Sequence, residues 1–172
     1  MTKILLLSDT HSYMGEDILK YVKQVDEVWH AGDIGDLKVT DAIKKLKPLR
    51  AVFGNIDSAE ARLEFPEHLK FRCEDVKVWI THIGGYPGRY APAVREMIKV
   101  HTPNLFICGH SHILRVMNDK KLNLLHMNPG ACGIQGFHKI RTLLRFELND
   151  GKIEKLEAIE LGLRGSLIAS DQ

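Results

Sequence analysis

Cysteines are few in this sequence, and they show no pairing pattern. The 172 residues include only Cys73, Cys108 and Cys132, and no two of them have the Cys-x-x-Cys spacing. An odd number of widely spaced cysteines argues against a disulfide framework and against a zinc ribbon. We therefore expect a reducing compartment and predict that the protein is cytoplasmic.

Long apolar runs are also missing. The apolar run near the N-terminus covers only residues 4–7, which is too short for a membrane span or for the core of a signal peptide. We expect a buried strand at this position and no membrane association.

Neither sign of charge dominates. The chain has 24 Lys and Arg against 22 Asp and Glu, a formal net charge of +2, and no basic arm or stripe. Stable binding to nucleic acid is therefore not expected.

A chain of this length can bury a core without disulfides. We predict one domain over residues 1–162 and a flexible tail over residues 163–172, and a homo-oligomer stays open.

Short apolar runs alternate with helical patterns in the first third of the chain. The patterns predict strands at 3–8, 27–32 and 49–55, with helices at 16–25 and 37–46 between them. This order predicts a parallel sheet with right-handed crossovers.

The rest of the chain is richer in predicted hairpins. We expect hairpins over 68–82, 113–128 and 140–161, with a helix at 91–100 and a buried strand at 104–110. Two packed sheets with helices outside would accommodate both parts in one α/β domain.

Metal-ligating side chains follow five predicted strands, at the point where each strand ends. Ligands in open α/β sheets gather beyond the carboxyl ends of the strands, so we expect these side chains to converge on one rim. The seven candidate donors are Asp9, His11, Asp33, Asn55, His82, His110 and His112. Seven donors are too many for one tetrahedral zinc and suit two divalent metals that share a carboxylate.

Each piece of this pattern is weak alone, because an isolated Asp-x-His, His-x-His or Gly-Asp is usually turn chemistry. The combination resembles the calcineurin-like metallophosphoesterase superfamily, whose motifs are D-x-H, G-D-x-x-D, G-N-H-D, H and G-H-x-H. The resemblance spans residues 4 to about 130. The short length and Asn128-Pro129-Gly130 are similar to the small YfcE-type phosphodiesterase family. The resemblance implies a four-layer α-β-β-α sandwich of two mixed sheets flanked by helices, the metallophosphoesterase fold.

The resemblance also implies roles for the donors. One metal would take Asp9, His11, Asp33 and His112; the other would take Asp33, Asn55, His82 and His110. Asp33, Asn55 and His82 are the residues expected to be catalytic, while Asp36 and Asp57 would hold ligands by hydrogen bonds. The cofactors implied are two divalent metal ions, with Mn²⁺ favoured and Ni²⁺, Fe²⁺, Co²⁺ or Zn²⁺ as alternatives.

The reaction implied is hydrolysis of a small phosphodiester by attack of a metal-bridging hydroxide. Ile56 stands where the wider pattern has a histidine assigned to transition-state stabilisation or to protonation of the leaving oxygen. Small YfcE-type members commonly lack this histidine too, and losing general acid help costs about 10²–10⁴-fold. We therefore favour phosphodiesters. The alternatives are a phosphomonoesterase or nucleotidase with the same site, and a metal-free interaction scaffold like the retromer subunit of this fold.

A glycine-rich stretch over residues 83–90 follows His82. It is either a substrate loop, in which Arg89 contacts phosphate and Tyr90 stacks on a base, or an ordinary connection. Of the remaining histidines, His30 is expected in the core or beside a ligand. His138 could approach the site, and His126 has no assigned role.

Overall fold

The computed structural model describes residues 1–170, and its strands form two five-stranded mixed sheets. The first sheet has the order β12-β11-β1-β2-β3 and the second has the order β4-β5-β8-β10-β9. The strands of the first sheet are β1 (Thr2–Leu7), β2 (Glu27–His30), β3 (Leu49–Ala51), β11 (Ile140–Asn149) and β12 (Lys152–Leu163). Those of the second are β4 (His68–Cys73), β5 (Val76–Thr81), β8 (Leu105–Ile107), β9 (Leu114–Asp119) and β10 (Leu124–Pro129).

Parallel strands form the middle of each sheet, as the alternating pattern of strands and helices predicts. In the first sheet β1, β2 and β3 run parallel, while β11 pairs with β1 in antiparallel register. In the second, β5, β8 and β10 run parallel, and β4 and β9 are antiparallel edges. The three predicted hairpins are therefore confirmed as β4–β5, β9–β10 and β11–β12.

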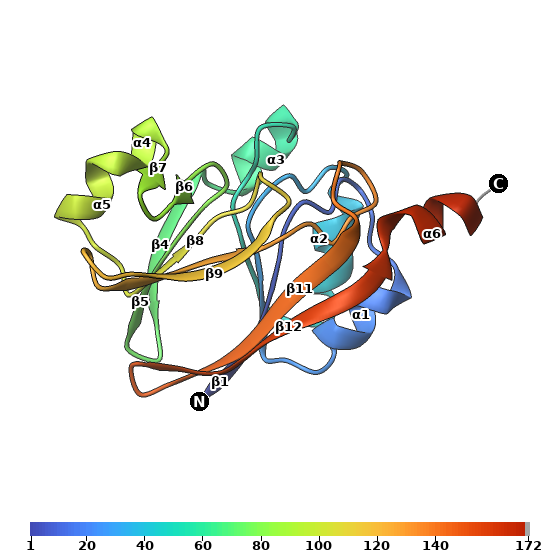
Figure 1. Cartoon of the computed structure of the whole chain (residues 1–172). Coiled ribbons are helices and arrows are strands. Elements are labelled where there is room, and N and C mark those ends of the chain that lie inside the picture. Colours follow the sequence, from blue (N-terminus) through green and yellow to red (C-terminus); the bar gives the residue numbers. More distant parts are fainter. Residues whose placement is uncertain (171–172) are drawn as a thin grey trace.

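Helices cover the outer face of each sheet. Helices α1 (Glu16–Val22) and α2 (Lys38–Lys44) pack on the first sheet; α4 (Pro92–Arg95) and α5 (Met97–Val100) lie on the second, at the opposite side of the molecule (Figure 1). Three apolar clusters fill the three interfaces between these layers. The predicted four-layer α-β-β-α sandwich is thus confirmed.

Strand β1 shows how the sequence builds the layers. Successive side chains of a strand point to opposite faces. Accordingly Ile4 and Leu6 pack between the two sheets, whereas Leu5 and Leu7 pack against the helices. All four side chains are fully buried, which is why this run has no polar alternation.

Several helices differ from the sequence prediction. Helix α1 ends at Val22, three residues early, and the helix expected over 91–100 is divided into α4 and α5. Helix α3 (Ala59–Glu64) was not predicted, because six residues are too few for a helical period to show. Its signal was the cap: the Ser58 hydroxyl accepts the Ala61 N–H.

Two further elements lie in segments expected to be irregular. A small hairpin of β6 (Gly85–Tyr86) and β7 (Arg89–Tyr90) forms within the glycine-rich stretch. The segment expected as a flexible tail begins inside β12 and continues as α6 (Arg164–Ser170), which projects from the sheets (Figure 1). Arg164 donates from Nε to the His138 carbonyl at 2.8 Å. Residues 171–172 lie outside the described residues, and flexibility of the segment stays a prediction.

No helix within residues 1–170 is both long and apolar enough to cross a membrane.

Candidate metal centre

The predicted donors meet where the carboxyl ends of the two sheets lie side by side. The loops after β1 and β2 are joined by the Asp9 N–H, which donates to the Gly32 carbonyl at 2.9 Å. The Gly109 N–H, after β8, donates to the His82 carbonyl, after β5, at 3.0 Å. Parallel strands end at a common edge of their sheet. The donors of both sheets therefore lie together where these two edges meet.

The backbone at these donors is unusual. Five of them have left-handed φ angles, which side chains other than glycine rarely adopt: Asp9 (56°), His11 (43°), Asp33 (55°), His110 (71°) and His112 (61°). Such conformations cost about 1–3 kcal/mol each and concentrate at functional sites, where the surrounding structure imposes them.

The donors form two compact groups. Asp9, His11 and His112 make the first group, with the His112 Nε2 3.2 Å and the His11 Nε2 3.8 Å from Oδ1 of Asp9. Asp33, His82 and His110 make the second. In each group one ligand atom per residue lies within 4.8 Å of the others.

Asn55 and Asp33 extend this grouping. The Asn55 Oδ1 lies 3.0 Å from Nδ1 of His110, so the amide oxygen borders the second group. The Asp33 Oδ2 lies 3.2 Å from Nε2 of His82 and 3.5 Å from Nε2 of His11. A single carboxylate oxygen is therefore next to a histidine of each group.

Each carboxylate has one oxygen held by the protein and the other turned to the centre. The Asp9 Oδ2 accepts the Ser8 hydroxyl at 2.6 Å and the His110 N–H at 3.1 Å, while its Oδ1 faces the histidines. The Asp33 Oδ1 accepts the Ile56 N–H at 3.1 Å, and its Oδ2 faces His82 and His11.

His82 follows the same rule. Its Nδ1 lies 2.7 Å from the Ala31 carbonyl, so Nδ1–H donates there and leaves the Nε2 lone pair for the centre. Hydrogen bonds of this kind fix the ring and the tautomer of metal-binding histidines.

Three buried atoms that face the centre have no hydrogen-bond partner within residues 1–170: Asp9 Oδ1, His11 Nε2 and His82 Nε2. Buried polar atoms are almost always satisfied, and an unpaired cluster calls for an ion or water. Carboxylate oxygens and imidazole nitrogens are a donor set suited to Mn²⁺, Fe²⁺, Co²⁺, Ni²⁺ or Zn²⁺. The residues therefore fit a divalent metal.

The electrostatics agree with this fit. Burial raises the pKa of Asp9, but contacts with His11 and His112 outweigh it and hold that pKa well below its usual range. Burial also raises the pKa of Asp33, and the bond to His82 outweighs it, so the net shift is downward. Both carboxylates are thus ionised and attract positive charge, which protons on the histidines or a metal ion can supply.

Burial is graded across the site. Asp9, Asp33 and His82 are buried, His11 and His112 are half-buried, and Asn55 and His110 are exposed. A solute can therefore reach the centre from the side of Asn55 and His110, next to the second group.

The two predicted supporting aspartates behave differently. Asp57 is buried and accepts the Gly35 N–H at 2.9 Å and the Gly54 N–H at 2.7 Å, which ties the loop after β2 to the loop after β3. Asp36 is exposed, and its carboxylate accepts the Lys38 N–H at 2.9 Å at the start of α2. Its bond supports a helix and not a donor side chain.

Arg89 and Tyr90 lie on β7. Arg89 is exposed, and the Tyr90 hydroxyl donates to Asp119 at 2.6 Å while its ring packs on Phe106. Neither residue lines the cavity that adjoins His110. Their contact with substrate stays a prediction.

Two further residues lie next to the candidate donors. The Asn128 amide donates to the Gly109 carbonyl at 2.9 Å and to the Ser111 hydroxyl at 3.1 Å, so it holds the loop that carries His110 and His112. The His138 ring packs edge-on against His112, with centroids 5.1 Å apart. Asn128 belongs to the Asn-Pro-Gly loop noted in the sequence, but its role as a support was not predicted. His138 approaches the site as the sequence allowed.

His30 is fully buried, as expected for a core position. Its Nε2 lies 3.0 Å from the Thr10 hydroxyl, and its Nδ1 accepts the Gly32 N–H at 3.1 Å. Burial lowers its pKa to about 4, so the ring is neutral and links the loops after β1 and β2.

Comparison with known proteins gives a consistent result. A family model described as the calcineurin-like phosphoesterase superfamily domain matches residues 2–151. A probable metallophosphoesterase of Methanocaldococcus jannaschii is 26% identical over 161 residues, which cover 90% of this chain and 80% of that protein.

Solved structures share the fold. One, described as a novel archaeal phosphodiesterase, superposes with a TM-score of 0.73 at 23% identity and covers 92% of this chain and 99% of its own. Vps29 of Entamoeba histolytica, solved as a zinc complex, gives a TM-score of 0.70 at 16% identity, with 93% and 99% covered. At these identities the likeness is one of fold.

Proposed function

The chain belongs to the calcineurin-like phosphoesterase superfamily, and from that premise we propose that it is a phosphodiesterase that works with two divalent metal ions. The observation that carries the proposal is the position of Asp33, whose Oδ2 lies 3.2 Å from one group's histidine and 3.5 Å from the other's. One carboxylate oxygen between two donor groups could contact two ions at the separation of about 3.5–4 Å that is typical of two-metal sites. The proposed substrate is a small phosphodiester, and the proposed location is the cytoplasm.

Under this proposal Asp9, His11, Asp33 and His112 hold one ion, and Asp33, Asn55, His82 and His110 hold the other. Bound there, the ions would supply Lewis acidity and bring the pKa of water near neutrality. Mn²⁺ is the ion we expect, because the carboxylate and amide oxygens of the donor set suit it; the imidazoles also suit Fe²⁺, Ni²⁺ and Zn²⁺.

The protein's own contribution is orientation. The Ala31 carbonyl fixes the His82 ring, and the backbone N–H groups of Ile56 and His110 fix one oxygen of each carboxylate. Donor atoms held in this way need no rearrangement when charge develops on a phosphoryl group. The exposed side at Asn55 and His110 leaves room for that group to enter.

Preference for diesters rests on Ile56. Its side chain is 46% exposed at the rim of the site and carries no proton to give a leaving oxygen. General acid help is worth about 10²–10⁴-fold. A monoester of an alcohol needs it, because its leaving oxygen must be protonated, whereas an activated diester releases p-nitrophenolate without a proton. A phosphomonoesterase or nucleotidase with the same donors is the alternative that activity assays would reveal.

The test compares Asp33→Asn with the unchanged protein in turnover of bis-p-nitrophenyl phosphate with added Mn²⁺. Losing a supporting contact to a metal ligand costs 10–100-fold, so losing the shared ligand should cost at least about 100-fold. Asp41→Asn, which removes an exposed carboxylate on α2, is the matched control and should retain the rate.

Bound metal is measured in the same samples. A well-folded protein with neither metal nor turnover would contradict the proposal and favour the metal-free scaffold. The unpaired buried atoms of Asp9 and His82 favour the metal-dependent enzyme over that alternative, because a cluster of carboxylate and imidazole donors without partners suits an ion. Higher turnover of p-nitrophenyl phosphate than of the diester would favour the monoesterase.

A further inference from the structure

A cavity of about 230 Å³ adjoins the exposed side of the metal centre. Its wall includes Gly109, His110 and Ser111 at the end of β8, together with residues of the loop after β5 and of strands β9 and β10. Much of the lining is apolar, including the side chains of Ile83 and Ile113. An apolar cavity of about 150 Å³ accepts benzene, so this space is large enough for a planar ring.

His126 is the unusual residue of this wall. It is fully buried on β10, and neither of its ring nitrogens makes a hydrogen bond of ordinary geometry within residues 1–170, although the Phe106 backbone lies near enough to raise its pKa slightly against the effect of burial. The ring stacks obliquely near Phe106, with centroids 5.8 Å apart. Leaving a buried polar group unpaired costs about 1–3 kcal/mol, and a phenylalanine would fill the same place without that cost. Burial lowers the pKa of His126 to about 4, so the imidazole is neutral and offers one donor and one acceptor.

A second feature of the wall is a pair of planar side chains, Arg115 and Tyr86. The Arg115 guanidinium lies over the Tyr86 ring, 3.9 Å from its centroid, and both side chains are half-buried. Arg115 on β9 is paired with Asn128 on β10, two residues from His126, so both strands present these side chains on one face. Aromatic and guanidinium planes are the surfaces on which bases stack.

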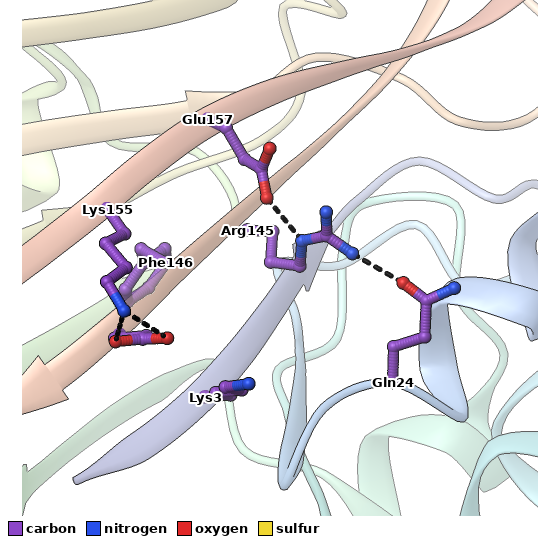
Figure 2. Close-up of a pocket in the computed structure, with 7 residues that line it drawn as sticks. Lys3, Gln24, Arg145, Phe146, Lys155 and Glu157 are labelled. Carbon is purple, nitrogen blue, oxygen red and sulfur yellow. Dashed lines mark hydrogen bonds and ion pairs between the residues drawn. The ribbon is translucent and has the colours of Figure 1, made fainter.

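Another cavity of the molecule lacks these features. This cavity lies on the first sheet and has a volume of about 310 Å³. Figure 2 shows its lining residues, among which Arg145 is bonded to Glu157 and Gln24. The two bonds measure 2.5 Å and 2.6 Å. Lys155 contacts Glu147 at 3.2 Å. These charged groups satisfy one another, and no candidate metal donor of the described chain lines the space. The cavity beside His110 combines an unpaired buried group with the metal centre.

We propose that the cavity beside His110 binds the planar, hydrogen-bonding ring of the substrate, a nucleobase, with His126 bonding to the ring edge and Arg115 and Tyr86 lining its face. The identification of this ring as part of the substrate rests on the proposed phosphodiesterase function. Binding of the ring itself does not, because no metal donor other than His110 lines the cavity within the described chain.

The first test measures binding of adenosine, which has no phosphate, to the metal-free protein by NMR titration. Shifts are expected at residues 83–86, 109–115 and 126. His126→Phe removes both ring nitrogens and keeps an aromatic ring, and it should weaken adenosine binding roughly 2- to 10-fold, as expected for one hydrogen bond. His101→Phe, at an exposed histidine directly after α5, is the matched control and should bind adenosine as the unchanged protein does.

Two outcomes would overturn the inference. One is an unchanged protein whose spectrum does not respond to adenosine at millimolar concentration. The other is equal binding of phenol and adenosine with no effect of His126→Phe, which would make the space a plain apolar cavity. Should His126→Phe fail to fold, Arg115→Ala replaces it, with a roughly fivefold loss expected from the lost stacking partner and Arg72→Ala as its control on β4.

The second test uses turnover. The ratio of kcat/KM for thymidine 5′-(p-nitrophenyl phosphate) to that for methyl p-nitrophenyl phosphate should fall in Arg115→Ala and not in Arg72→Ala. An unchanged ratio would overturn the substrate assignment. If adenosine binds in a His126-dependent way but no diester turns over in any metal, the phosphodiesterase proposal fails and the ring site stands. If diesters turn over but adenosine does not bind, only the ring site fails.

Discussion

At the scale of single residues, the backbone and the side chain of Ile56 have separate effects on the site. Its backbone N–H donates to Oδ1 of Asp33 at 3.1 Å, a bond that any residue except proline could make at this position. Its side chain is exposed at the rim and contributes no titratable group. Position 56 can therefore gain an imidazole without losing the bond that holds the shared carboxylate.

We expect Ile56→His to raise turnover of alkyl phosphomonoesters, up to about 100-fold, because a general acid helps most with poor leaving groups. Turnover of bis-p-nitrophenyl phosphate should change much less, since p-nitrophenolate leaves without a proton. Both rates are measured with Mn²⁺, and Ile56→Gln controls for polarity. A folded, metal-loaded Ile56→His variant with no gain on monoesters would refute this role of the position.

The donors could be predicted from the sequence because each one follows a buried strand. The ring-binding residues could not. His126 is an isolated histidine inside a strand, and nothing in its neighbours tells that both nitrogens are unpaired. Tyr86 and Arg115 are 29 residues apart in number, and only the fold brings them into contact. The loop glycines pointed to residues 83–90, but the side chain on the cavity wall is Tyr86 and not Tyr90.

At the scale of elements, the carboxyl ends of β1 and β8 approach each other closely. Gly109 marks this approach, since a Cβ there would collide with the Ser8 hydroxyl and the Asp9 carboxylate. Strands were predictable from apolar runs, whereas α3 and the β6–β7 hairpin were too short for a period to emerge. The sequence does not show how closely the ends of β1 and β8 approach each other, except through the glycine at position 109.

Gly109→Ala should lower the free energy of unfolding by about 1–3 kcal/mol, the usual cost of overpacking a buried site. It should also weaken Mn²⁺ binding, because the carboxylate it displaces is a proposed ligand. Denaturant unfolding and metal titration measure the two effects. Gly165→Ala on α6, where an added Cβ meets no atom within 4 Å, is the control. Equal stability of both variants would contradict the close approach.

At the scale of the whole molecule, the candidate centre joins two sheets. Asp9, His11, Asp33 and Asn55 come from the ends of the first sheet, and the three remaining histidines come from the second. Two packed sheets were predictable from the order of strands and helices. The pairing of β1 with β11 was not, because Thr2 and Leu148 are matched only in the finished fold.

An ion held between the sheets should stabilise the whole sandwich. At 100 times its Kd a ligand adds about 2.7 kcal/mol, and 1 kcal/mol shifts Tm by roughly 2–4 °C for a chain of this size. Excess Mn²⁺ should therefore raise Tm by roughly 5–10 °C over the protein in EDTA. Asp33→Asn should show little of this rise. An unchanged Tm in the unmodified protein would mean that the ion does not connect the sheets.

The route of the chain through the first sheet has a consequence for biosynthesis. Strand β1 lies between β2 and β11. The sheet that carries Asp9 and Asp33 is therefore incomplete until residues 140–149 have left the ribosome. By then His82, His110 and His112 have also been made. Non-local pairing of this kind forms late, because distant segments must first meet. Under the proposed function, an ion held by both sheets would therefore bind only after residues 140–149 have been made, and the metal available at that moment would decide which ion enters the site.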